Sequence, residues 1–194
     1  MIKKLLILLL VIIVMAVLFF VVKNYFIFSE KTDIAKIGDN KKESPQDIAL
    51  QNIIKADIAS QNSHNFEDFL GLRSENKTMP ESKYNYLSIY NSQKKEGIFF
   101  MDRIVSAKIV GIKEIPLKPG GVITGPFKYP FDEMRMFYVG IDYTVTWEDK
   151  YIFNGINYRL YVLGKEGGKW VIIEASSAPS DILVRAGYGL GTEK

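Results

Sequence analysis

The most prominent hydrophobic pattern is an unbroken apolar run near the start of the chain. Residues 5–22 include no charged or polar side chain, and aromatic and apolar residues up to position 28 extend the run past Lys23. A helix over the run would be about 27 Å long, close to a hydrocarbon core of about 30 Å. The pattern predicts a transmembrane anchor over residues 5–28, behind a cytoplasmic tail of residues 1–4.

The charges on either side of the run predict its orientation. Lys3 and Lys4, together with the α-amino group, outweigh Lys23 alone, so the positive-inside rule places the N-terminus in the cytoplasm. A cleaved signal peptide also has a lysine-rich start. The run is longer than a usual signal core, however, and no small-x-small cleavage site follows it. We therefore expect a retained, single-pass signal-anchor in the cell membrane and an extracytoplasmic C-terminal domain.

A polar stretch separates the apolar run from the first helical periodicity. Residues 29–43 are rich in charged and small polar side chains, which predicts a solvated linker. Ser44 and Pro45 then match the cap and first position of a helix, and Asp47 places an acid near its positive end. We expect a helix of about sixteen residues to follow and to pack an apolar stripe on a core.

Two shorter helical segments and then a change of period are expected further along. Asn65 can cap a second helix that reaches Leu70, and a third segment runs from about residue 84 to residue 95. From residue 104 onward β-branched residues and alternation of apolar and polar positions predict strands. The predicted strands lie over residues 104–115, 137–147, 156–163 and 170–175.

These elements define the predicted fold class. It is α+β: an N-terminal transmembrane helix, then two or three helices packed on a curved antiparallel sheet. The extracytoplasmic domain is expected over residues 44–179, and residues 180–194 are expected to form a C-terminal tail. Hydrophobic residues make up 47% of the chain and aromatic residues 13%, which is enough to close one core.

Composition excludes several kinds of site. The chain has no cysteine, which removes disulfides, thiol nucleophiles and a lipidated cysteine, and His64 alone cannot form a multi-histidine metal site. The 25 basic and 22 acidic residues differ by three, and the three lysines beside the apolar run account for that difference. The remainder is neutral and lacks the positive field of nucleic-acid-binding proteins. We expect no cofactor, no metal and no nucleic-acid partner.

Helices followed by strands rich in Tyr and Trp resemble the nuclear-transport-factor-two-like fold, a cystatin-like α+β cone of sheet wrapped around helices. The resemblance covers residues 44–179 and is based mainly on the helix pattern over 47–70 and the closing strand over 168–172. With an anchor ahead of it, the chain is similar to single-pass Gram-positive envelope proteins, including conjugation and type IV secretion assembly factors. The resemblance implies an enzyme pocket, a ligand binder or a docking module, so it leaves the function open.

Four polar residues on neighbouring strands are candidates for a pocket. Tyr138 and Asp142 share the even-numbered face of one predicted strand, and Tyr158 and Arg159 lie on the next. Asp142 could act as a base in a desolvated pocket, because burial raises the pKa of a carboxyl group. Its alternation with Gly, Thr and Tyr favours exposure instead. No acid–base pair is visible, and we predict that the protein is not an enzyme.

Three tyrosines on the third predicted helix, Tyr84, Tyr86 and Tyr90, are candidates for an interface, since tyrosine is favoured at protein contacts. The leading hypothesis is a membrane-anchored binding or scaffold module of a bacterial cell-envelope assembly, secretion or conjugation-like. Its sheet, or the Pro/Gly loop over residues 116–130, would contact another envelope protein or a second copy of the chain. The alternative is a pocketed domain that binds or processes a small envelope ligand. A deep cavity with Asp142 buried would favour that alternative, and a filled cone with exposed aromatic residues would favour docking.

Overall fold

The computed structural model describes residues 44–117 and 131–193. The chain divides into two units, residues 1–42 and 43–194, and every described residue belongs to the second. Its helices are α2 (Pro45–Asn62), α3 (Phe66–Gly71), α4 (Lys83–Gln93) and α5 (Ser180–Arg185), with short 3-10 helices η1 (Lys94–Glu96) and η2 (Phe100–Arg103). Its strands are β1 (Ile104–Ile115), β2 (Met134–Val145), β3 (Gly155–Glu166) and β4 (Lys169–Ser177).

Helix α2 starts at the residues that the sequence indicates. The Ser44 hydroxyl accepts a hydrogen bond from the Asp47 N–H at 3.2 Å, and the Asp47 carboxylate accepts one from the Ser44 N–H at 3.0 Å. This capping box satisfies two backbone donors at the helix start. Leu50, Ile54 and Ile58 are buried and form the expected apolar stripe. The predicted first helix of the domain is confirmed.

The two shorter helices also form where expected. The Asn65 side chain accepts a hydrogen bond from the Asp68 N–H at 3.2 Å at the start of α3, and Ser82 accepts one from the Asn85 N–H at 3.3 Å at the start of α4. Helix α4 continues into η1, which ends at Gly97 with a φ of +67°. Glycine adopts this left-handed conformation without the steric cost of a side chain, so the chain can turn here toward β1.

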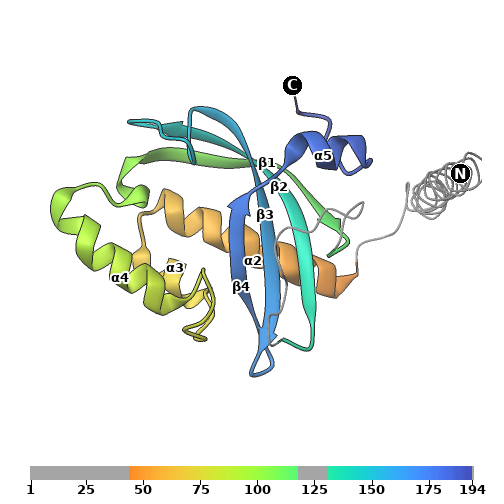
Figure 1. The fold of residues 1–194 in the computed structure, drawn as a ribbon, viewed down its shortest axis with the longest axis horizontal. Helices are drawn as coiled ribbons and strands as arrows, with labels where there is room; N and C mark the ends of the chain where they lie inside the picture. Colours follow the sequence, from red (N-terminus) through yellow and green to blue (C-terminus); the bar gives the residue numbers. More distant parts are fainter. Residues whose placement is uncertain (1–43, 118–130, 194) are drawn as a thin grey trace, which may run out of the picture. The chain divides into compact units, whose positions relative to one another are not determined.

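The four strands form an antiparallel meander in the order β1-β2-β3-β4, as the alternating pattern predicts. The sheet curves around α2, and α3 and α4 lie beside α2 on the same side (Figure 1). Gly167 and Gly168 join β3 to β4 with φ values of +56° and +83°. Two successive positive φ values suit a two-residue hairpin turn. This turn returns the chain along β4.

Each face of the sheet packs against a hydrophobic core. The odd-numbered residues of β2 face α2 and pack in one core with Leu50 and Ile54. The even-numbered residues Met136 and Tyr138 face the other way and pack in a second core with Leu183. Side chains of adjacent strand residues point to opposite faces, so one strand supplies both cores.

Residues 180–193, predicted as a C-terminal tail, supply part of this second core. Helix α5 lies on the face of the sheet opposite α2, and the chain end follows it (Figure 1). Gly111 and Gly140 are partners in the β1–β2 register, and a Cβ atom on Gly140 would lie 3.2 Å from Leu190 Cδ1. The two glycines thus form a notch across the strands, and Leu190 occupies it.

The predicted fold class is corrected in its first element. It placed a transmembrane helix ahead of the domain, but no helix within residues 44–117 and 131–193 is long and apolar enough to cross a membrane. Helix α2, for example, exposes Gln46, Asn52 and Lys55 on the face away from the core. The observed class is α+β, with helices on both faces of a four-stranded antiparallel sheet. Outside the described residues lie the predicted cytoplasmic tail (1–4), anchor (5–28) and linker (29–43), and most of the Pro/Gly loop.

Candidate functional site

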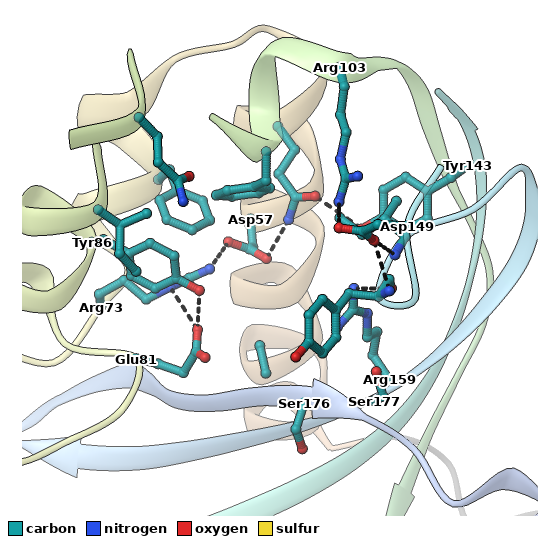
Figure 2. Close-up of a pocket in the computed structure, with 18 of the residues that line it drawn as sticks. Asp57, Arg73, Glu81, Tyr86, Arg103, Tyr143, Asp149, Arg159, Ser176 and Ser177 are labelled. Atoms are coloured by element: carbon teal, nitrogen blue, oxygen red, sulfur yellow. Dashed lines mark hydrogen bonds and ion pairs between the residues drawn. The ribbon is translucent and has the colours of Figure 1, made fainter. Parts of the chain in front are cut away.

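A cavity of about 820 Å³ lies between the helices and the concave face of the sheet (Figure 2). This volume falls in the range of about 300–1,000 Å³ that small-molecule sites occupy. Its wall combines apolar and aromatic side chains with six charged residues: Asp57, Glu81, Asp149, Arg73, Arg103 and Arg159. Asp57 lies on α2, and Arg73 and Glu81 lie between α3 and α4. Arg103 ends η2, Asp149 lies between β2 and β3, and Arg159 is in β3.

An ion pair between Arg73 and Asp57 lies at the inner end of the cavity. Arg73 Nη2 is 2.7 Å from Asp57 Oδ1, and the two side chains are only 1% and 0% exposed. Burial alone would lower the pKa of Arg73, but the Asp57 carboxylate, together with smaller contributions from Tyr86, Glu81 and Tyr161, outweighs it and raises the pKa, so the guanidinium stays charged. The guanidinium carbon also lies 3.9 Å from the centre of the Phe69 ring. Arg73 Nε and Nη1 are buried and have no hydrogen-bond partner among the described residues.

The second carboxylate oxygen of Asp57 is the end of a hydrogen-bond chain. It accepts bonds from Gln61 Nε2 at 2.9 Å and from the Tyr161 hydroxyl at 2.8 Å. Gln61 Oε1 in turn accepts a bond from the Tyr143 hydroxyl at 3.0 Å. Burial raises the pKa of both tyrosines, so their hydroxyls stay protonated and act as donors. Asp57 Oδ2 therefore accepts two hydrogen bonds, whereas Oδ1 faces Arg73 in the ion pair and has no hydrogen-bond partner of its own among the described residues.

Glu81 is the inner carboxylate that still has an oxygen free to accept a hydrogen bond. Its Oε2 accepts a hydrogen bond from the Tyr86 hydroxyl and lies 3.9 Å from Arg73 Nε. No residue in the described part of the chain bonds to its Oε1, and the side chain is 17% exposed. Burial raises the pKa of Glu81, although the Arg73 charge opposes the shift. Glu81 can accept a further hydrogen bond from the cavity side.

Arg103 and Asp149 form a second ion pair, further out. Arg103 Nη2 is 2.9 Å from Asp149 Oδ2, and the guanidinium carbon lies 4.1 Å from the centre of the Trp147 ring. Burial would raise the pKa of Asp149, but the N–H groups of Ile152 and Tyr151, and Arg103, together lower it. Arg103 is 3% exposed, and its Nε and Nη1 have no hydrogen-bond partner within residues 44–117 and 131–193. This buried guanidinium therefore keeps unused donors.

Arg159 adds a third guanidinium on the outer side. Its Nη2 donates to the Tyr151 carbonyl oxygen at 2.8 Å. No carboxylate in the described part of the chain lies within ion-pair distance of it. In Figure 2, Arg159 and Arg103 lie to one side of Asp57, whereas Glu81 lies to the other.

The rim of the cavity is apolar and open to solvent. A group of exposed apolar side chains around one opening indicates a contact surface, because such patches are rarely left open to water. Four residues that line the cavity remain exposed: Ile89 (39%), Ile98 (44%), Trp147 (44%) and Tyr151 (56%). A ring or an aliphatic chain entering here would bury them.

The four residues predicted to form a pocket are divided between the two faces of the sheet. Only Arg159 lines the cavity. Tyr138 and Tyr158 lie on the opposite face, where their ring centres are 5.6 Å apart, and Asp142 is exposed on that face. Tyr158 and Arg159 are adjacent in one strand and must point to opposite faces. The structure therefore does not bring the four together.

The three predicted interface tyrosines also differ in their surroundings. Tyr84 is 46% exposed on α4. Tyr86 points into the cavity and donates to Glu81. Tyr90 stacks on Phe66, with ring centres 4.1 Å apart. Of the three, only Tyr84 lies on the surface as an interface residue would.

Sequence reasoning missed most of the charged residues of the cavity. The position of Asp57 in the sequence could have indicated its role. It lies next to Ile58 and three residues after Ile54 on the apolar stripe of α2, where burial of an unpaired carboxylate would be costly. Arg73 and Glu81 lie between helices, where no periodicity marks them. Their role depends on contacts between residues far apart in the chain.

Comparison of the chain with protein-family models and with curated proteins gave no match. The resemblance to the nuclear-transport-factor-two-like fold therefore stays a prediction from the sequence.

Proposed function

We propose that this domain binds a small amphipathic molecule in the cavity between its helices and its sheet. The supporting observation is a cavity of about 820 Å³ whose wall includes buried guanidinium nitrogens, in Arg73 and Arg103, without hydrogen-bond partners in the described residues. A buried, unsatisfied donor costs about 1–3 kcal/mol, and more when it is charged. An oxygen atom of a bound molecule would remove that cost, and the apolar rim would hold the rest of the molecule.

The polar groups are arranged for binding more than for reaction. Asp57 Oδ2 accepts two hydrogen bonds and Oδ1 is held in the ion pair to Arg73, and the Tyr143 and Tyr161 hydroxyls donate to fixed acceptors. A general base or a nucleophile needs a free lone pair beside the reacting atom. Glu81 Oε1 has such a lone pair, and we propose that it accepts a donor of the bound molecule. A non-enzymatic role, as the sequence predicts, is therefore our proposal.

The wider setting stays a prediction. The cell-membrane location, the envelope partner and the scaffold role are based on the sequence of residues 1–28 and on the family resemblance. The contacts within residues 44–117 and 131–193 do not test them. A ligand-binding domain is compatible with a place in an envelope assembly, because ligand occupancy could regulate such an assembly. Of the scaffold and ligand-binding hypotheses, the cavity makes ligand binding the better supported.

Binding can be tested on the purified full chain with two fluorescent probes. 8-Anilinonaphthalene-1-sulfonate has an oxyanion and N-phenyl-1-naphthylamine is its neutral counterpart; both fluoresce more strongly in apolar surroundings. We expect saturable binding of both. The substitution Ala175→Trp, which fills the cavity wall, should abolish it, and Ala175→Leu should weaken it.

The matched control is Ala56→Trp, which adds the same ring to the exposed side of α2 and should leave binding unchanged. Probe bound by the apolar residues 5–22 would give a signal that is insensitive to both variants. Circular dichroism verifies that each variant is folded. Equal binding by the wild type and a folded Ala175→Trp would refute the proposal.

A further inference from the structure

The charged side chains of the cavity form two groups of opposite net charge. The inner group has two carboxylates and one guanidinium: Asp57, Glu81 and Arg73. The outer group has two guanidiniums and one carboxylate: Arg103, Arg159 and Asp149. When all six are ionised the inner group has a net charge of −1 and the outer group +1, and Figure 2 shows them on opposite sides of the cavity.

The outer group has the donors that an oxyanion needs. Arg103 uses Nη2 for Asp149 and has the Trp147 ring beside it, but its Nε and Nη1 are buried and have no partner among the described residues. Arg159, unlike Arg103, has no carboxylate partner among the described residues. A guanidinium presents its N–H groups in a planar fork that fits a carboxylate or phosphate group. These two side chains together favour an anionic group over a neutral one.

The inner group has an acceptor that a cation needs. The Tyr86 hydroxyl holds Glu81 Oε2, which leaves Oε1 for a donor from the cavity. Arg73 is shared between Asp57 at 2.7 Å and Glu81 at 3.9 Å, so it compensates Glu81 only in part. An ammonium group beside Oε1 would complete the compensation and donate a charge-assisted hydrogen bond.

The two groups are close enough to act on one small molecule. All six charged side chains line the same cavity of about 820 Å³, and Figure 2 shows both groups around it. A ligand with only one charge would satisfy one group and leave the other with its donors or acceptor unused. A charge that loses water without gaining a partner lowers affinity.

We infer that the ligand is a zwitterion with an apolar or aromatic body, its oxyanion against Arg103 and Arg159 and its ammonium against Glu81. The inference depends on the proposed function, since it names the ligand class of the same cavity. A short peptide with free ends has this chemistry, and so does an ω-amino acid.

A matched set of dipeptides tests the inference, because capping removes one charge at a time from the same body. Phenylalanyl-alanine is the zwitterion; its N-acetyl form is the anion, its amide is the cation, and the doubly capped form is neutral. Titration calorimetry and displacement of the naphthyl probes from the full chain measure the affinity of each. We expect the zwitterion to bind at least tenfold more tightly than either singly charged form. The set is repeated with one alanine added, which lengthens the distance between the charges.

Variants assign each charge to its side of the cavity. Glu81→Gln should weaken binding of the zwitterion and of the cation about tenfold and leave binding of the anion unchanged. Arg159→Met should weaken binding of the zwitterion and of the anion about tenfold and leave binding of the cation unchanged. The control is Arg185→Met, which removes an arginine that is 74% exposed on α5 and should change nothing. If the anion or the neutral form binds as tightly as the zwitterion at both lengths, or if no peptide displaces a probe from the cavity, the inference fails and the proposed function stands. If neither probe responds to Ala175→Trp, the proposed function itself fails.

Discussion

Replacing Asp57 with asparagine removes a charge from the centre of the network and nearly preserves the shape of the side chain. Asp57 and Arg73 are 2.7 Å apart and almost fully withdrawn from solvent. The amide oxygen of the new side chain could still accept one hydrogen bond, but Arg73 would lose its main counter-charge. The substitution therefore measures the cost of a buried, partly compensated guanidinium.

The expected magnitude follows from these contacts. Removing one partner of a buried ion pair costs about 3–5 kcal/mol, because the remaining charge has been taken out of water. Glu81 lies 3.9 Å from Arg73 Nε and compensates part of the charge, so the loss in the free energy of unfolding should be near the lower end, about 3 kcal/mol. A domain of this size has about 5–15 kcal/mol in total, so the variant should remain folded without denaturant.

Urea unfolding followed by the fluorescence of Trp147 and Trp170 measures the loss. Asp181→Asn is the matched control, because its ion pair to Arg185 has a similar length of 2.9 Å but is exposed on both sides. An exposed pair contributes about 0–1 kcal/mol. Adding Arg73→Met to Asp57→Asn should recover part of the loss, since the double variant no longer buries a guanidinium without its main counter-charge. The recovery is partial because Glu81 then loses its contact with Arg73. The reasoning is refuted if Asp57→Asn costs no more than Asp181→Asn, or if the two substitutions at positions 57 and 73 are simply additive.

Three further predictions concern the same structure. Tyr161→Phe should reduce the free energy of unfolding by about 1.5–3 kcal/mol and Tyr143→Phe by about 1 kcal/mol, since the first donates to a carboxylate and the second to an amide; equal losses in urea would contradict this. Burial raises the pKa of Glu81, so its contribution to stability is fully present below the ordinary pKa of 4.5 and is lost as pH rises. The free energy of unfolding of the wild type, relative to that of Glu81→Gln, should therefore fall as the pH is raised from 4.5 to 7 in paired urea titrations. A rise over the same range would contradict the prediction. Gly140→Ala should destabilise by about 1–3 kcal/mol through overpacking, because the new Cβ atom would lie 2.9 Å from Val110 Cγ2 and 3.2 Å from Leu190 Cδ1. A thermal melt unchanged from wild type would show that the notch is not tight.

The helices and strands of the domain could be predicted because each has a local cause. The Ser44 and Asn65 caps, the turn at Gly97 and the alternation in β2 depend on residues within a few positions of one another. The second core was not predicted. The even-numbered face of β2 includes glycine and polar residues, which indicated solvent, yet α5 and Leu190 cover much of it.

The candidate site was harder to predict because its contacts join distant parts of the chain. The bond from Tyr161 to Asp57 spans 104 positions, and that from Tyr143 to Gln61 spans 82. Tyr158 and Arg159 were paired as neighbours in sequence, although the alternation of a strand separates them. A charged residue inside the apolar stripe of α2 was the one local indication of the network.

The chain beyond β4 has a practical consequence for anyone who trims this protein. A version that stops at residue 179, where the sequence alone places the end of the domain, would uncover Leu160, Val162 and Ile173 on one side of the sheet. A broad apolar strip of this kind promotes self-association. Such a shortened version should elute early from a sizing column and take up hydrophobic dyes without any ligand pocket being involved.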